Sequence, residues 1–277
     1  MSVLAKIIAH KKTEIAALDA RAIRHAAEES PTPRDFLPSF TREQGTGDRG
    51  RRLKLIAELK RASPSKGILA PHLDLLQVAE LYAQNGASAI SVLTDEKLFM
   101  GKLETLHELR FARKSKLPLL RKDFMIDEVQ LYESRAGGAD AVLLIAAALT
   151  DDRHFAALHA LALELGLTAL VEVHDEAETE RALKLEDVGL IGINNRNLAT
   201  FEVSLETTER IRPMIPSEIV VVAESGIFTS QDVERLAQAK VDAILVGEAL
   251  VTSEDIAAKV RELAGATVPA PTGSRLE

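Results

Sequence analysis

The stretch Glu58-Leu59-Lys60-Arg61-Ala62-Ser63-Pro64-Ser65-Lys66-Gly67 ends an apolar run in alternating charges and then turns through serine, proline and glycine. Successive side chains of a β-strand point to opposite faces, so Glu58 and Lys60 lie on one face and Leu59 on the other. The pattern predicts a strand that carries two opposite charges into the loop at its end. Solvated charges at an ordinary strand end are the alternative for this stretch taken alone.

The same design, a short apolar run with polar or glycine residues at its carboxyl end, recurs along the chain. We count eight such runs, which end near Lys60, Thr94, Lys122, Ile145, Glu172, Asn194, Glu224 and Gly247. Amphipathic stretches such as residues 75–85, 151–165 and 230–239 follow them, as expected where crossover helices join parallel strands. Eight strand-helix units predict an α/β protein with the (β/α)8 TIM barrel fold. A doubly wound open sheet is the alternative, but no G-x-G-x-x-G follows the first strand and polar residues end nearly every strand.

Two segments flank the predicted barrel domain, which we place at residues 53–264. Residues 1–52 are expected to form a helical extension and its connection. Within residues 2–18, apolar side chains recur at helical spacing and predict a helix packed on the barrel: Leu4, Ile7, Ile8, Ile15 and Leu18. Proline, glycine and charged residues dominate residues 30–52, which predicts an irregular connection. Residues 265–277 are expected to form a flexible tail.

Composition excludes several classes of protein. With 46% hydrophobic residues in 277, the chain is able to bury a sizeable core. It has no cysteine, which excludes disulfides and thiolate metal sites and fits the reducing cytoplasm where we expect the protein. The net charge of −8 argues against nucleic-acid binding. The longest apolar stretch, residues 139–149, is too short to span a bilayer, so no membrane association is expected.

In a barrel of this type the carboxyl ends of the strands meet at one mouth. This predicts that side chains far apart in the sequence share one pocket: Lys60, Lys122, Glu172, Asn194, Glu224 and Ser225. Lysines and carboxylates in such a pocket shift each other's pKa and allow one site to hold both an acid and a base. The turns after the seventh and eighth strands, at Ser225-Gly226 and Gly247-Glu248, predict a phosphate site built from backbone N–H groups.

The histidines show no H-E-x-x-H or comparable spacing, so no metal site is expected. His174 follows Glu172 closely and is a candidate for ligand contact. The alternative for His174, as for the two glycine turns, is an ordinary structural role.

Taken together, these motifs closely resemble the indole-3-glycerol phosphate synthase family of tryptophan biosynthesis over nearly the whole chain. The resemblance is carried by residues 58–67, Leu93-Thr94 with Phe99 and Gly101, residues 121–124, Leu170-Val171-Glu172, residues 193–198, residues 224–227 and Val246-Gly247-Glu248. It implies closure of 1-(2-carboxyphenylamino)-1-deoxyribulose 5-phosphate to indole-3-glycerol phosphate, with release of carbon dioxide and water. The implied enzyme is a cofactor-free carboxy-lyase whose partner is this small sugar phosphate with its anthranilate moiety.

The resemblance also implies roles for individual residues. Lys122 is the expected general acid and Glu172 the general base, while Lys60, held by Glu58, binds substrate anions and assists dehydration. Asn194 and Glu224 orient the substrate and the charged groups. The remaining expected contacts are Phe99 and Phe124 with the aryl ring, Arg196 with the anthranilate carboxylate, and Ser63, Ser225, Gly226, Gly247 and the backbone of Glu248 with the phosphate.

One position departs from the family pattern, because Lys102 stands where many relatives have serine. A monomer is expected, with a homodimer as the alternative. Two other functions stay open: an aldolase in which Lys122 or Lys60 forms a Schiff base, and a barrel that binds a sugar phosphate without catalysis.

Overall fold

The computed structural model describes residues 3–40, 52–64, 66–113, 115–198 and 200–265. Within these residues, eight parallel strands close into a barrel in the order β1-β10-β9-β8-β7-β6-β5-β4. The strands are β1 (Lys54–Leu59), β4 (Ala89–Leu93), β5 (Leu119–Lys122), β6 (Ala141–Ile145), β7 (Thr168–Val173), β8 (Leu190–Asn194), β9 (Val220–Glu224) and β10 (Ala243–Val246). The predicted (β/α)8 barrel is therefore confirmed, and the open sheet is excluded because β1 pairs with both β4 and β10.

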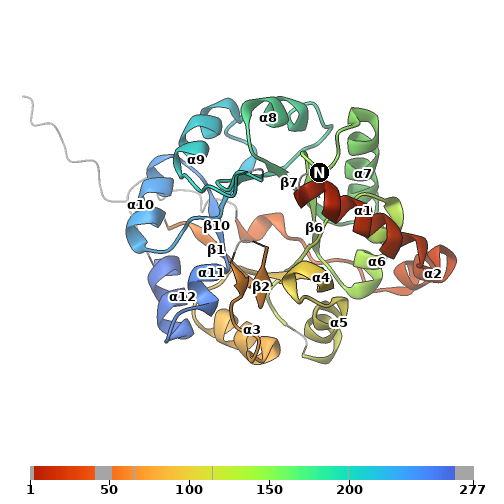
Figure 1. Ribbon diagram of the computed structural model, residues 1–277, viewed down its shortest axis with the longest axis horizontal. Helices are drawn as coiled ribbons and strands as arrows, with labels where there is room; N and C mark the ends of the chain where they lie inside the picture. The colour runs from red at the N-terminus through yellow and green to blue at the C-terminus, as the bar shows by residue number, and fades with distance from the viewer. Residues whose placement is uncertain (1–2, 41–51, 65, 114, 199, 266–277) are drawn as a thin grey trace, which may run out of the picture.

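Helices form the outer ring around these strands (Figure 1). They are α3 (Leu75–Gln84), α4 (Glu96–Phe99), α5 (Leu103–His107) with η2 (Glu108–Ala112), α6 (Glu128–Gly137), α7 (Asp152–Glu164), α8 (Glu176–Ala182), α9 (Glu206–Ile211) with η3 (Arg212–Met214), α10 (Ser230–Gln238), α11 (Glu248–Val251) and α12 (Ile256–Gly265). Many begin at an aspartate whose carboxylate accepts backbone N–H groups, as Asp74 does for α3 and Asp151 for α7. A short hairpin, β2 (Ala62–Ser63) and β3 (Gly67–Ile68), follows β1.

The barrel strands are buried on both faces. One face packs against the helices in a large apolar cluster that includes Leu55, Leu59 and Val171. The other fills the barrel interior with side chains such as Ile56, Leu120 and Leu143. This is why the strands read as almost continuous apolar runs.

Two N-terminal helices lie outside the strand-helix units, α1 (Val3–Ala16) and α2 (Ala20–Glu29). The helix predicted in residues 2–18 is present as α1. The sequence pattern did not indicate α2, which packs against α6, nor η1 (Leu37–Ser39), where Phe36 and Phe40 are buried against the barrel interior. Residues 41–51 of the predicted connection and residues 266–277 of the predicted tail lie outside the described residues.

Candidate active site

One cavity opens at the carboxyl ends of the strands, and the catalytic, substrate-binding and phosphate-binding residues expected from the sequence line it. They are Glu58, Lys60, Ser63, Phe99, Lys122, Phe124, Glu172, Asn194, Arg196, Glu224, Ser225, Gly226, Gly247 and Glu248. The convergence follows from the closed barrel, since the last residues of β1, β5, β7, β8 and β9 end at the same rim.

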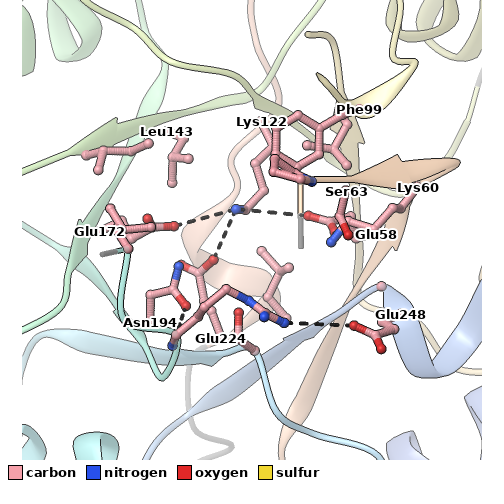
Figure 2. A pocket seen from close by; sticks show the side chains of 18 of the residues that line it. Glu58, Lys60, Ser63, Phe99, Lys122, Leu143, Glu172, Asn194, Glu224 and Glu248 are labelled. Atoms are coloured by element: carbon pink, nitrogen blue, oxygen red, sulfur yellow. Dashed lines mark hydrogen bonds and ion pairs between the residues drawn. The ribbon is translucent and has the colours of Figure 1, made fainter. Parts of the chain in front are cut away.

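Lys122 stands at the centre of this cavity, surrounded by three carboxylates (Figure 2). Its Nζ lies 3.5 Å from Glu172 Oε2, 3.5 Å from Glu224 Oε2 and 4.0 Å from Glu58 Oε2. Lys60 forms a tighter pair with Glu58, at 2.7 Å between Nζ and Oε1. Three carboxylates and two ammonium groups therefore share one buried pocket, and Glu58 contacts both lysines.

Two glycines make room for two of these carboxylates. A Cβ atom on Gly192 in β8 would lie 2.2 Å from Glu224 Oε1, and one on Gly247 would lie 2.5 Å from Glu58 Oε1. These contacts are far shorter than van der Waals distance, so a side chain at either position would displace a carboxylate. The sequence analysis assigned Gly247 to phosphate binding alone and did not single out Gly192.

The buried charges shift one another's pKa. Burial lowers the pKa of Lys122, but the three carboxylates outweigh burial and raise it well above the ordinary value. Burial likewise opposes ionisation of Glu172, yet Lys122 and His174 outweigh it and hold its pKa far below the usual range. Burial, with the neighbouring carboxylates of Glu172 and Glu58, raises the pKa of Glu224 to about 8 despite the nearby Lys122. Burial at this position thus favours the protonated form of Glu224.

The turn after β9 has an unusual backbone. Ser225 and Gly226 both adopt left-handed conformations, with φ of 68° and 78°, and a Cβ on Gly226 would lie 2.4 Å from Val203 Cγ1. The turn is fixed by the buried Asn195, whose amide donates to the Ser225 carbonyl at 3.1 Å. Asn195 is a scaffold residue, while its neighbour Asn194 faces the cavity. The sequence did not separate these two roles.

Basic side chains lie beside the two glycine turns. Arg196 Nη2 is 3.8 Å from one Glu248 carboxylate oxygen, and Lys66 Nζ is 3.7 Å from the other. Arg196 also donates to the Phe201 carbonyl at 3.4 Å. At these distances Glu248 holds both cations loosely, so an anionic ligand is able to compete for them.

The opposite side of the cavity is apolar. Phe99 and Phe124 lie with ring centroids 6.3 Å apart, and Leu143 and Ile145 of β6 continue the wall. The sequence missed a further contribution, because Val3, Leu4 and Ile7 of α1 also line the cavity. Helical periodicity identified Leu4 and Ile7 as apolar positions but carried no signal for which part of the barrel they cover.

A single buried cation anchors α1 to this wall. Lys11 is 3% exposed, and its Nζ lies 2.9 Å from Asp95 Oδ2, 2.8 Å from Asp123 Oδ1 and 2.8 Å from Glu14 Oε2. Asp95 follows β4, and Asp123 is the residue after Lys122. Lys11 therefore ties the N-terminal helix to two neighbouring strand ends beside the central lysine.

Two further positions discussed from the sequence, Lys102 and His174, lie outside the cavity lining. Lys102 is exposed at the start of α5, whereas its neighbour Gly101 is buried so tightly that a Cβ would lie 2.2 Å from the Leu93 carbonyl oxygen. His174 lies behind Glu172. No group of three or more histidine, cysteine, aspartate or glutamate side chains is placed to hold a metal ion in the part of the chain described. Among the described helices, none is long and apolar enough to cross a membrane.

Two solved structures share the fold at low sequence identity. A mutant tryptophan synthase alpha-subunit from Pyrococcus furiosus aligns with a TM-score of 0.56 and 18% identity, covering 78% of this chain and 99% of that one. A thiamine phosphate pyrophosphorylase from Pyrococcus furiosus aligns with a TM-score of 0.52 and 20% identity, covering 76% and 93%. These likenesses concern the fold alone.

Sequence comparison is more specific. The family model described as indole-3-glycerol phosphate synthase matches residues 4–263. Proteins named indole-3-glycerol phosphate synthase are 56% identical in Dehalococcoides mccartyi (78% of this chain, 83% of the relative) and 50% identical in Roseiflexus castenholzii (95% and 98%). A third, from Polaromonas naphthalenivorans, is 48% identical over 95% of this chain and 98% of the relative. With the barrel and its mouth of lysines and carboxylates, this match shows that the chain belongs to the indole-3-glycerol phosphate synthase family.

Proposed function

We propose that the protein closes 1-(2-carboxyphenylamino)-1-deoxyribulose 5-phosphate to indole-3-glycerol phosphate, with loss of carbon dioxide and water. The observation that supports this most strongly is the buried Lys122 between Glu172, Glu224 and Glu58, with an apolar wall on one side and two glycine turns on the other. An aromatic group, a reacting centre and a phosphate fit these three parts in order. All of these groups come from one chain, so a monomer holds a complete site.

Ring closure begins when the aryl carbon attacks the ribulose carbonyl. The carbonyl oxygen becomes an alkoxide, and Lys122 protonates it as general acid. Phe99 and Phe124 hold the aryl ring against the apolar wall, which orients the attacking carbon.

Loss of the carboxylate as carbon dioxide then restores part of the conjugation. Dehydration follows: Glu172 removes a proton, and a protonated group assists the departing hydroxyl. Lys60 supplies this assistance, because Glu58 holds its ammonium at the rim of the same cavity. Asn194 and Glu224 orient the substrate and the charged groups.

The substrate anions bind at separate places. Arg196 presents a planar guanidinium to the anthranilate carboxylate until decarboxylation. The phosphate binds to Ser63 and to the turns at Ser225-Gly226 and Gly247-Glu248 through side-chain hydroxyls and backbone N–H groups.

The resting site is poorly suited to proton transfer until substrate enters. Lys122, with its raised pKa, is a weak acid, and Glu172, with its lowered pKa, is a weak base, because the two stabilise each other's charge at 3.5 Å. A substrate inserted between them separates the pair and moves both pKa values toward neutral. The same pairing disfavours the aldolase alternative, since Schiff-base formation needs a neutral amine.

The test is indole fluorescence over time after mixing purified protein with the substrate, without metal or cofactor. We expect a rising signal from wild type and a turnover about 10²–10⁴-fold lower for Lys122→Ala, with a much smaller change in substrate binding. Lys116→Ala, an exposed lysine before the amino end of the same strand, is the matched control.

Equal rates for Lys122→Ala and wild type would remove Lys122 from the role of acid. A folded wild type that gives no signal would contradict the synthase. In that case, borohydride trapping with substrate separates an aldolase, which becomes covalently labelled, from a barrel that only binds.

A further inference from the structure

His174 occupies a position behind the proposed base. It follows β7 directly and lies two residues after Glu172, at a bend that precedes α8. Its Nε2 lies 3.3 Å from Glu172 Oε1, and its side chain is 10% exposed. Glu172 lines the cavity and His174 does not, so His174 contacts the proposed base outside the cavity lining.

The other ring nitrogen faces a second carboxylate. His174 Nδ1 lies 2.9 Å from Glu178 Oε2, and the same oxygen accepts the His174 backbone N–H at 2.9 Å. Glu178 is itself fixed in the first turn of α8, where its backbone N–H donates to Asp175 Oδ1 at 2.8 Å. The imidazole is therefore held in one orientation by the start of the helix.

A ring between two carboxylates has one protonation state that suits both. Ionised carboxylates only accept hydrogen bonds, so Nδ1 carries a proton toward Glu178, while Nε2 is buried beside Glu172 Oε1 without a hydrogen-bond partner in the described residues. A proton on Nε2 as well makes the ring an imidazolium, the form that two adjacent carboxylates favour. The electrostatics agree: burial lowers the pKa of His174, but Glu172 and Glu178 outweigh burial and raise it to about 10.

We propose that His174 is a positioning residue that remains charged through the catalytic cycle and keeps Glu172 ionised and oriented as the base. This role rests on the proposed function. In the resting site Glu172 has two cationic neighbours, Lys122 at 3.5 Å and His174 at 3.3 Å. When Lys122 gives up its proton to the substrate it loses its charge, and His174 is then the cation that still stabilises the Glu172 carboxylate.

The other charged groups near His174 and Glu172 have ion-pair partners of their own. On the barrel side, Glu224 of β9 and Glu58 of β1 contact Lys122. On the helix side, Glu176 of α8 pairs with Arg210 of α9. The titration of His174 therefore depends mainly on the two carboxylates that it contacts.

The first measurement is the charge of the ring, which needs no turnover. In protein labelled with ¹⁵N-histidine, the His174 signal is assigned by its loss in His174→Gln. We expect both ring nitrogens to stay protonated through pH 8. In Glu178→Gln we expect the midpoint of the His174 titration to fall by about one pH unit or more, because one of the two carboxylates that stabilise the charged ring is removed. A ring that titrates near 6.5 in wild type would overturn the proposal.

The second measurement is the pH profile of kcat, which reports the pKa values of groups in the enzyme-substrate complex, where bound substrate separates Glu172 from Lys122. Loss of a cation raises the pKa of Glu172, so His174→Gln should move the acid limb upward by about one pH unit. Glu178→Gln leaves that limb in place, because His174 is still charged at acid pH. His25→Gln, an exposed histidine on α2, is the control.

A purely structural role predicts a different result. His174→Gln would then lower activity by the same factor at every pH, with the acid limb unmoved, and the proposal would be wrong. If Glu178→Gln moved the acid limb as far as His174→Gln does, the proposal would also be contradicted. The orientation of the ring, and not its charge, would then control the pKa of Glu172. An inactive wild type with a charged His174 would instead refute the proposed function.

Discussion

At the scale of single residues, the site depends on close packing of like charges that an ordinary protein interior avoids. Glu58, Glu172 and Glu224 lie around one lysine, and neither carboxylate oxygen of Glu224 has a hydrogen-bond partner within the described residues. Gly192 and Gly247 provide the space. Such a cluster costs stability unless one of its members is neutral.

Burial favours the protonated form of Glu224, so the stability of the folded protein depends on pH. Its pKa is about 8 in the folded protein and 4.5 ordinarily. The unfolded chain therefore ionises first, and the stabilisation from this group, complete below pH 4.5, is lost as pH rises toward 8. Glu224→Gln resembles the neutral form and avoids this loss. We expect its free energy of unfolding to exceed that of wild type increasingly from pH 5 to 8, reaching about 4 kcal/mol at pH 8.

Urea unfolding at several pH values measures this difference, with the exposed Glu164→Gln as the control. A constant difference between Glu224→Gln and wild type across pH 5–8 would mean that Glu224 is already ionised in the folded protein.

At the scale of elements, α1 forms part of the cavity wall and is held there by Lys11. Lys11→Met leaves the buried Asp95 and Asp123 without their shared cation, a loss that costs about 3–5 kcal/mol for a buried pair. We expect α1 to loosen and the wall formed by Val3, Leu4 and Ile7 to be lost. KM should rise about tenfold, with a smaller change in kcat, because the aryl ring loses apolar contacts.

Hydrogen exchange of residues 3–16 and steady-state kinetics test this expectation. Lys12→Met changes the neighbouring exposed lysine and should behave as wild type. If Lys11→Met loses stability but keeps its KM, α1 does not contribute to substrate binding.

At the scale of the whole molecule, the two ends of the barrel have separate tasks. The carboxyl ends carry the cavity, while Phe36 and Phe40 close the interior beside the first residues of strands, among them Ala89 and Ala243. Phe36 is fully buried and lies 5.0 Å from Phe40 between ring centroids. The closed end therefore contributes packing.

Phe36→Ala should lower the free energy of unfolding by about 3–5 kcal/mol through the cavity that it leaves. We expect kcat/KM to stay within about twofold of wild type at temperatures where the variant is folded. Thermal unfolding and the fluorescence assay measure the two effects, and the exposed Leu163→Ala controls for loss of an apolar side chain. A large loss of kcat/KM in folded Phe36→Ala would show that the two ends are coupled.

Local sequence predicted the elements well, because each strand is a short apolar run that ends where polar residues begin. The runs that end at Lys122, Ile145, Asn194 and Glu224 stop at those residues in the structure. Helix α3 begins at the predicted Leu75 and ends one residue before the predicted Asn85. Helix α2 was not predicted, because its apolar face is made mostly of alanines, and Ile23 is its single large apolar residue.

The sequence by itself determined the barrel and which polar residues gather at its mouth, because hydrophobic periodicity places strands and closure brings all their carboxyl ends together. Only the tertiary structure decided the distances between those groups. The salt bridges of Lys11 with Asp95 and Asp123 join segments far apart in the sequence and follow from no local pattern. The physical reason is that burial and charge act through space, and the spacing between chain segments is fixed only when the whole barrel packs.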